Sequence, residues 1–185
     1  LDYELDGTRM YSLFVKAYKH QAKIEVMVRV HKESRLEPEN LYVSLPFGTN
    51  EDAEMYLDKT GCVIRPGIDQ LPGSNEDFYL IQNAVIWKKD STNLCVITKD
   101  APLVTMGNLE AAPIKMCDGN DNERNHDMVY SWIMNNFWET NFKVNLGGFY
   151  EFSYTLFMHN DDSINSAFKC CEAENEGLLS CYAEE

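Results

Sequence analysis

Two polar stretches of the sequence contain the side chains best suited to hold a polar ligand. The first stretch, 58–75, supplies Arg65, Asp69 and Gln70. The second, SWIMNNFWETNF, covers 131–142 and supplies Asn135, Asn136, Trp138, Thr140 and Asn141. Amide groups both donate and accept hydrogen bonds, and an indole face can stack on the flat side of a sugar ring. The two stretches therefore predict a surface that contacts carbohydrate.

A structural alternative exists for the same residues. Asparagine readily satisfies backbone groups at a strand end, so Asn135 and Asn136 are equally suited to closing a corner. Asp69 is similarly suited to capping a turn. Any two of the loop carboxylates, those of Asp69, Glu76 and Asp77, could form an acid and base pair for glycoside hydrolysis, but sequence spacing does not place two of them across a substrate. Both interpretations remain open from sequence alone.

The sequence contains no complete catalytic or metal-binding motif. Its four histidines and six cysteines form no nucleophile and base signature, no CxxC pair and no zinc-site spacing. A phosphate-binding GxxxxGK segment is also missing from the sequence. His126 with Glu139 could serve a sugar epimerase, although their spacing is not diagnostic. We therefore expect no catalytic residue, no metal ligand and no cofactor within this chain.

Bulk composition limits the partners of the protein. The chain has 185 residues and a formal net charge of −14, which disfavours nucleic acid and anionic membrane surfaces as partners. No apolar run approaches the roughly 20 residues that cross a bilayer. The scattered cysteines and the lack of an Asn-x-Ser/Thr sequon favour reduced thiols in a cytoplasmic protein. The start at Leu1 indicates a processed product or a piece of a longer protein.

Most of the chain that must position these residues shows the sequence pattern of β-strands. The run KIEVMVRV (23–30) alternates apolar and polar residues, and so does FYEFSYTLFM (149–158). Further strands are expected at 10–18, 41–47, 77–87, 94–100 and 129–135. Glycine and proline predict a long loop over 58–75, and polar residues predict a crossing loop over 105–127.

These patterns predict an all-β fold, specifically an antiparallel β-sandwich, because no helices alternate with the strands. The sandwich is expected to occupy 1–160. The segment 161–185 is expected to form a separate tail that contains a short C-terminal helix. Apolar residues recur there at helical spacing behind an Asp162 or Ser163 cap: Ile164, Ala167, Phe168 and Cys171.

Several segments, in their order along the chain, resemble a known family. RPGIDQLPGS, TKDAPL and NNFWETNF, followed by GGFYEFSYTL, are similar to the C-terminal β region of glycoside hydrolase family 38, the α-mannosidases. The similarity covers residues from about 9 to about 158. The resemblance implies a supersandwich like that of galactose mutarotases. It leaves the tail after 160 without a counterpart.

The resemblance also implies a function. In this family the zinc ion, its ligands and the nucleophile belong to an N-terminal catalytic domain that this chain lacks. The chain would then be a non-catalytic β domain whose partners are that domain and a mannoside-type carbohydrate. The family-like positions include the eight residues named at the start. The alternative is a stand-alone carbohydrate-binding or interaction module.

Overall fold

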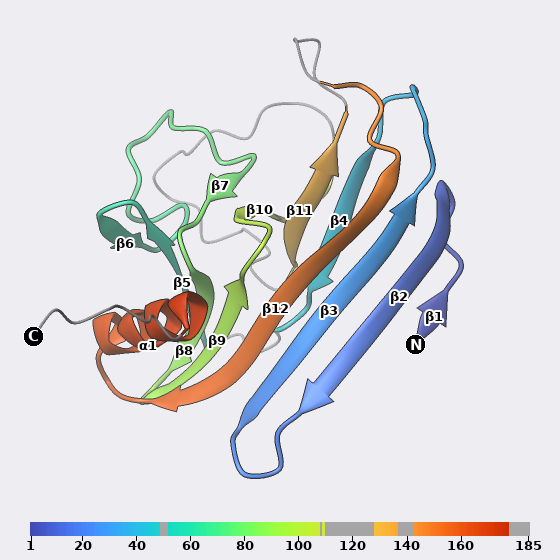
Figure 1. Ribbon diagram of the computed structural model, residues 1–185. Helices are drawn as coiled ribbons and strands as arrows, with labels where there is room; N and C mark the ends of the chain where they lie inside the picture. Colours follow the sequence, from blue (N-terminus) through green and yellow to red (C-terminus); the bar gives the residue numbers. More distant parts are fainter. Residues whose placement is uncertain (49–51, 108, 110–127, 137–142, 178–185) are drawn as a thin grey trace, which may run out of the picture.

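The computed structural model describes residues 1–48, 52–107, 109, 128–136 and 143–177. Two sheets face each other, and one helix lies on the outside of the larger sheet (Figure 1). The helix is α1 (Ile164–Glu176). The strands are β1 (Asp2–Tyr3), β2 (Thr8–Ala17), β3 (Lys23–Lys32), β4 (Asn40–Leu45), β5 (Glu54–Lys59), β6 (Cys62–Ile64), β7 (Tyr79–Leu80), β8 (Ala84–Lys89), β9 (Thr92–Thr98), β10 (Leu103–Met106), β11 (Val129–Asn135) and β12 (Gly148–Asn160).

The strand order defines an antiparallel sandwich. The eight-stranded sheet runs β1-β2-β3-β12-β9-β8-β5-β6, and the four-stranded sheet runs β4-β11-β10-β7. Every strand pairing in both sheets is antiparallel. The predicted all-β sandwich with a short C-terminal helix is therefore confirmed. Within the described residues, no helix is long and apolar enough to cross a bilayer.

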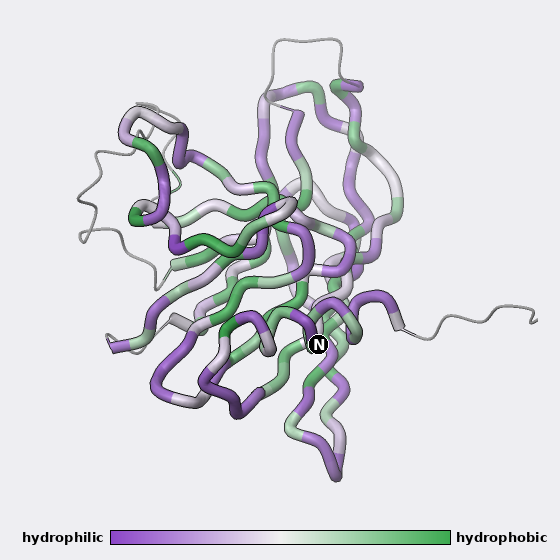
Figure 2. Tube along the Cα trace, turned by 90° about the vertical axis from the view of Figure 1, so that its left-hand side faces the viewer, coloured by the Kyte–Doolittle hydropathy of each residue, from purple (hydrophilic) through white to green (hydrophobic). Residues whose placement is uncertain are grey.

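Alternation along the long strands decides which side chains enter the core. On β3, Val28 and Val30 are fully buried between the sheets, whereas Ile24 on the same face is 40% exposed. The smaller sheet has fewer strands, so it does not cover the whole face of the larger sheet. Figure 2 shows hydrophobic segments gathered in the middle of the molecule and hydrophilic segments at the turns. The predicted apolar face of 23–30 is thus confirmed at its buried end.

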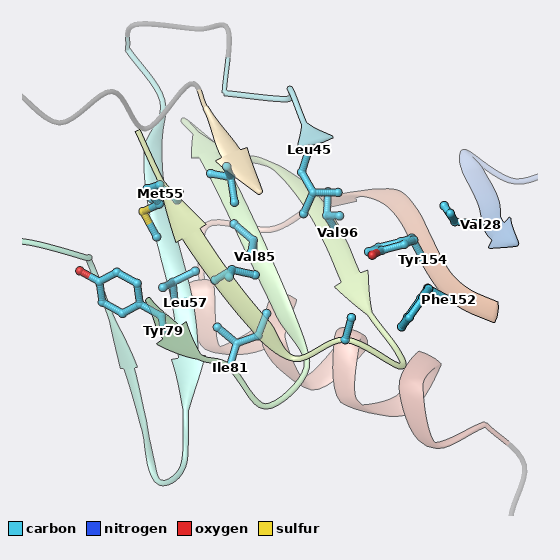
Figure 3. Packing of buried hydrophobic residues seen from close by; sticks show 14 of the residues in the cluster. Val28, Leu45, Met55, Leu57, Tyr79, Ile81, Val85, Val96, Phe152 and Tyr154 are labelled. Carbon is cyan, nitrogen blue, oxygen red and sulfur yellow. The ribbon is translucent and has the colours of Figure 1, made fainter. Parts of the chain in front are cut away.

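The core joins the two sheets through both apolar and polar contacts. Leu57, Tyr79 and Val85 pack at one end of it, and Phe152 packs at the other (Figure 3). Beside Phe152, the buried Tyr154 hydroxyl on β12 donates to Ser131 Oγ on β11 at 3.0 Å (Figure 3). The Ser131 hydroxyl in turn donates to the Ala101 carbonyl at 3.3 Å. This chain of bonds satisfies two polar groups that burial would otherwise leave without partners.

A second, smaller cluster fixes α1 to the outer face of β8 and β9. It contains Ala84, Ile86, Cys95 and Ile97 from the sheet and Ala167, Phe168 and Cys171 from the helix. Ser163 is the N-cap and accepts a hydrogen bond from the Ser166 N–H, and Gly177 ends the helix with φ 70°. The predicted helical spacing is confirmed, and Ser163 serves as the cap.

The prediction of a continuous loop over 58–75 is wrong at its start. Residues 62–64 form β6, which pairs with β5 in a hairpin. Gly61 lies in the connecting turn with φ +82°, a conformation that glycine adopts without steric cost. The glycine therefore turns the chain back on itself instead of ending ordered structure.

The expected strand over 77–87 is also divided. Its first part forms β7 in the smaller sheet, and its last part forms β8 in the larger sheet. The break occurs where the N–H of Gln82 donates to the Asp58 carbonyl and the N–H of Asn83 donates to Asp58 Oδ1, both at 2.9 Å. Besides β6, three strands were not anticipated, β1, β5 and β10, and β10 extends into the expected crossing loop.

Candidate functional site

The loop between β6 and β7 is closed by its own ion pair. The Arg65 guanidinium donates to both carboxylate oxygens of Asp69, at 3.1 and 2.9 Å. The Arg65 N–H donates to the same carboxylate at 2.8 Å. The bond with Arg65 lowers the pKa of Asp69 and raises that of Arg65. These two predicted site residues therefore hold each other across one turn.

Gln70 connects the same loop to the core. Its Oε1 accepts from the Gly67 N–H at 2.9 Å and from the Tyr79 hydroxyl at 2.8 Å. Tyr79 is 1% exposed, so this bond joins the loop to a fixed point inside the sandwich. The structure brings Arg65, Asp69 and Gln70 together within one turn, where they bond to backbone and side-chain groups of their own loop and to Tyr79.

Asn136 closes a corner at the end of β11. Its Oδ1 accepts from the Glu39 N–H at 2.5 Å, and its Nδ2 donates to the carbonyls of Glu37 and Val144 at 3.0 and 3.2 Å. The side chain is buried, and these three bonds satisfy backbone groups of two segments that meet the end of β11 at the corner. Asn136 therefore has the structural role that the sequence left open.

The other predicted residues of this stretch divide into two groups. Asn135 is the last residue of β11 and lies opposite Asn40 of β4. Trp138, Thr140 and Asn141 lie outside the described residues. Trp132, from the same stretch, is described and belongs to a group of rings that the sequence interpretation did not single out.

This group of rings, which we call the aromatic face, consists of Tyr42, Phe78, Tyr130 and Trp132. Tyr42 stacks on Trp132 with ring centroids 5.5 Å apart and an interplanar angle of 30°. Tyr130 meets Tyr42 edge-on at 6.2 Å, and Phe78 meets Trp132 edge-on at 5.9 Å. All four side chains are half-buried. Edge-on and stacked pairs of this kind hold aromatic rings in fixed orientations.

The outward direction of the aromatic face follows from strand alternation. Tyr130 and Trp132 alternate along β11 with the buried residues Val129 and Ser131, which point into the core. Tyr42 lies opposite Trp132 across the β4–β11 pairing. Phe78 arrives from the loop that contains Arg65, Asp69 and Gln70, so the aromatic face connects the two predicted stretches. The sequence already contained a signal for the aromatic face, because Tyr130 and Trp132 stand two positions apart in VYSW and so share one side of a strand.

Polar groups border the stacked rings. The Trp132 Nε1–H donates to Asn40 Oδ1 at 3.2 Å, and Asn40 is exposed. Ser44, also exposed, lies opposite Tyr130. Burial raises the pKa of Tyr42, which keeps its hydroxyl protonated and able to donate at neutral pH. The rings can therefore pack against an apolar ligand surface while neighbouring groups form hydrogen bonds.

His159 has a serine and a carboxylate nearby but lacks the geometry of a catalytic base. Ser166 Oγ lies 3.4 Å from His159 Nε2, and Asp161 Oδ2 lies 4.0 Å from the same nitrogen. A Ser-His-Asp relay requires the serine and the carboxylate at different ring nitrogens. Among the described residues, no group of three or more His, Cys, Asp or Glu side chains is placed to hold a metal ion.

The chain was compared with family models and with curated protein sequences. No family model matches the chain, and no curated protein sequence matches it. Neither comparison supports the resemblance to α-mannosidases, which therefore stays a prediction from the sequence.

Proposed function

We propose that this chain is a non-catalytic β domain of an α-mannosidase-like glycoside hydrolase and that its aromatic face contacts the carbohydrate. The stacked pair of Tyr42 and Trp132, bordered by Asn40, is the observation that carries the carbohydrate contact. Pyranose rings present an apolar face of C–H groups that packs on aromatic rings, and their hydroxyls bond to amides. The order of the family-like segments supports the assignment to α-mannosidases.

The loop and the corner have a supporting role in this proposal. The Arg65–Asp69 ion pair and the Gln70–Tyr79 bond hold the loop that delivers Phe78 to Trp132. Asn136 fixes the end of β11, the strand that carries Tyr130 and Trp132. Rigid support of this kind lowers the entropy that a binding surface loses when a ligand binds.

Catalysis would belong to an N-terminal domain of the same parent protein. Zinc would be held in that domain, and no residue described in this chain takes part in its binding. We place the parent in the cytoplasm. The isolated chain is expected to give no turnover of a nitrophenyl α-mannoside with added zinc, and measurable turnover would contradict the non-catalytic assignment.

Binding is tested by calorimetric titration of the folded chain with methyl α-mannoside and short α-mannosides. We expect saturable binding that Trp132→Ala abolishes. Phe149→Ala is the control, because Phe149 is an aromatic ring at the surface that lies on β12 in the larger sheet, away from the aromatic face. A flat titration of the wild-type chain, or equal losses in both variants, would contradict a carbohydrate contact at the aromatic face.

A stand-alone carbohydrate-binding module is the second candidate, since the aromatic face alone would suffice for it. The intact mass of the native product from its source cells distinguishes the two. A product that extends well beyond these 185 residues supports the mannosidase-like parent. A native product of this length supports the module.

A further inference from the structure

Two free cysteines meet beneath α1. Cys95 lies on β9 and Cys171 lies on α1, and both side chains are completely buried. Both residues belong to the same buried cluster, in which α1 packs on the outer face of β8 and β9. The fold therefore brings the two cysteines into one buried cluster although 75 residues of sequence lie between them. Neither thiol has a part in the proposed carbohydrate contact.

The attachment of α1 to the sheet depends on few contacts besides this cluster. At its C-terminal end, Asn175 donates to Asn83 at 2.9 Å, and Glu174 pairs with Lys23 at 2.6 Å. The apolar contribution comes mainly from Phe168 and its neighbours in the cluster. A covalent link at Cys171 would lie near the middle of the helix and would fasten what is otherwise a non-covalent attachment.

We propose that Cys95 and Cys171 form a reversible intramolecular disulfide that fastens α1 to β9 when the surroundings become oxidising. The oxidant is a low-molecular-weight disulfide such as oxidised glutathione. One cysteine thiolate attacks it, which forms a mixed disulfide and releases one small thiol. The second cysteine thiolate then attacks the protein sulfur of that mixed disulfide and releases the second small thiol. Two protein thiols lose two protons and two electrons, and the small disulfide is reduced to two thiols.

Burial makes this reaction depend on opening of the helix. The hydrogen bond with Cys95, followed by burial, raises the pKa of Cys171, so the closed protein holds little reactive thiolate. A small disulfide reaches the pair only when α1 lifts from the sheet. Phe168→Ala, which weakens the attachment, is therefore expected to make disulfide formation several-fold faster.

Disulfide formation would also fix a groove on the surface. Phe168, Lys169 and Glu172 of α1 line one wall of a groove of about 560 Å³, and Cys62 of β6 lies on the other. Cys62 is exposed, so its thiol can react without any movement of α1. Its reaction rate is therefore an internal reference for the rates of Cys95 and Cys171. The oxidised protein would hold the α1 wall in place.

The experiment is oxidation of the folded, full-length chain with glutathione disulfide, followed by peptide mapping under non-reducing conditions. We expect a Cys95–Cys171 linked peptide, the loss of two hydrogen atoms from the intact mass, and a Tm about 5–10 °C higher. Reduction with dithiothreitol should restore the original Tm. Cys95→Ala and Cys171→Ala should each abolish the shift, whereas Cys170→Ala should retain it.

Two outcomes would overturn the proposal. One is a folded protein in which Cys62 or Cys170 becomes glutathionylated while Cys95 and Cys171 remain reduced. The other is a Cys95–Cys171 link that forms only in denaturant or leaves the Tm unchanged. If either alanine variant fails to fold, peptide mapping and Tm measurement on the wild-type chain still decide between these results.

Discussion

The ring of Tyr42 lies stacked on the indole of Trp132, with the centroids 5.5 Å apart, across the pairing of β4 with β11. The two rings come from strands that the sequence separates widely but that the small sheet places side by side. Because Tyr130 and Phe78 meet this pair edge-on, the orientation of both rings is fixed before any ligand arrives. A preset pair of this kind is what the proposed carbohydrate contact requires.

Substitution of Tyr42 tests the contribution of the stack to binding. Tyr42→Phe retains the ring and removes the hydroxyl, whereas Tyr42→Ala removes the stack itself. We expect Tyr42→Ala to weaken saccharide binding by about 1 kcal/mol or more, and Tyr42→Phe to weaken it less. Calorimetric titration measures both. Equal affinities for the wild-type and Tyr42→Ala chains would show that the ring has no part in binding.

Substitution of Asn136 should affect stability and not chemistry. Asn136→Ala removes three hydrogen bonds at a buried corner and leaves the Glu39 N–H without its acceptor, which should lower the free energy of unfolding by about 2–3 kcal/mol. Urea unfolding followed by circular dichroism measures this loss. Asn165→Ala, at an exposed asparagine of α1, is the control and should change stability by less than about 0.5 kcal/mol. Similar values for the two variants would refute the corner role.

The Asp69 carboxylate should make stability depend on pH. Its pKa is lowered from 3.8 by the bond with Arg65, so its contribution is fully present above that value. The contribution is lost as the pH falls through the lowered pKa. Asp69→Asn should therefore destabilise the chain by about 1 kcal/mol at pH 7, and the difference from wild type should shrink as the pH falls through the lowered pKa. Urea unfolding across this range would disprove the prediction if the difference stayed constant.

Asp58 should be among the least replaceable carboxylates. It is buried, and it accepts hydrogen bonds from the N–H groups of Asn83 and Ala84 and from the Asn83 amide. Asp58→Ala leaves three donors without their acceptor, so we expect a loss of about 3 kcal/mol or more in thermal or urea unfolding. Glu4→Ala, at an exposed carboxylate, should have little effect. A small effect of Asp58→Ala would mean that water replaces the carboxylate.

The long strands and the helix could be predicted because their patterns are local. The alternation in KIEVMVRV and the helical spacing after Ser163 each reflect which side of one element is buried. The short strands could not, because tertiary contacts create them. β6 depends on the turn at Gly61, and the division of β7 from β8 depends on bonds to Asp58, which comes earlier in the chain.

The candidate site was only partly predictable for a related reason. Polar composition identified Arg65, Asp69 and Gln70 as a group. It could not show whether their side chains bind a ligand or form hydrogen bonds within their own loop, as they do in the structure. The amide of Asn136 posed the same difficulty, since its three bonds join segments that the fold brings together. The aromatic face as a whole could not be predicted from the sequence, because Tyr42 and Trp132 become neighbours only when β4 pairs with β11.

The position of β12 determines the order in which the larger sheet can assemble. β12 is the last described strand along the chain, yet it lies between β3 and β9 and pairs with both. Until residues 148–160 have left the ribosome, β1–β3 on one side and β5, β6, β8 and β9 on the other have no strand to join them. A nascent chain would therefore hold two unconnected half-sheets, each with an open edge, and completion of the sandwich would be a late and slow step.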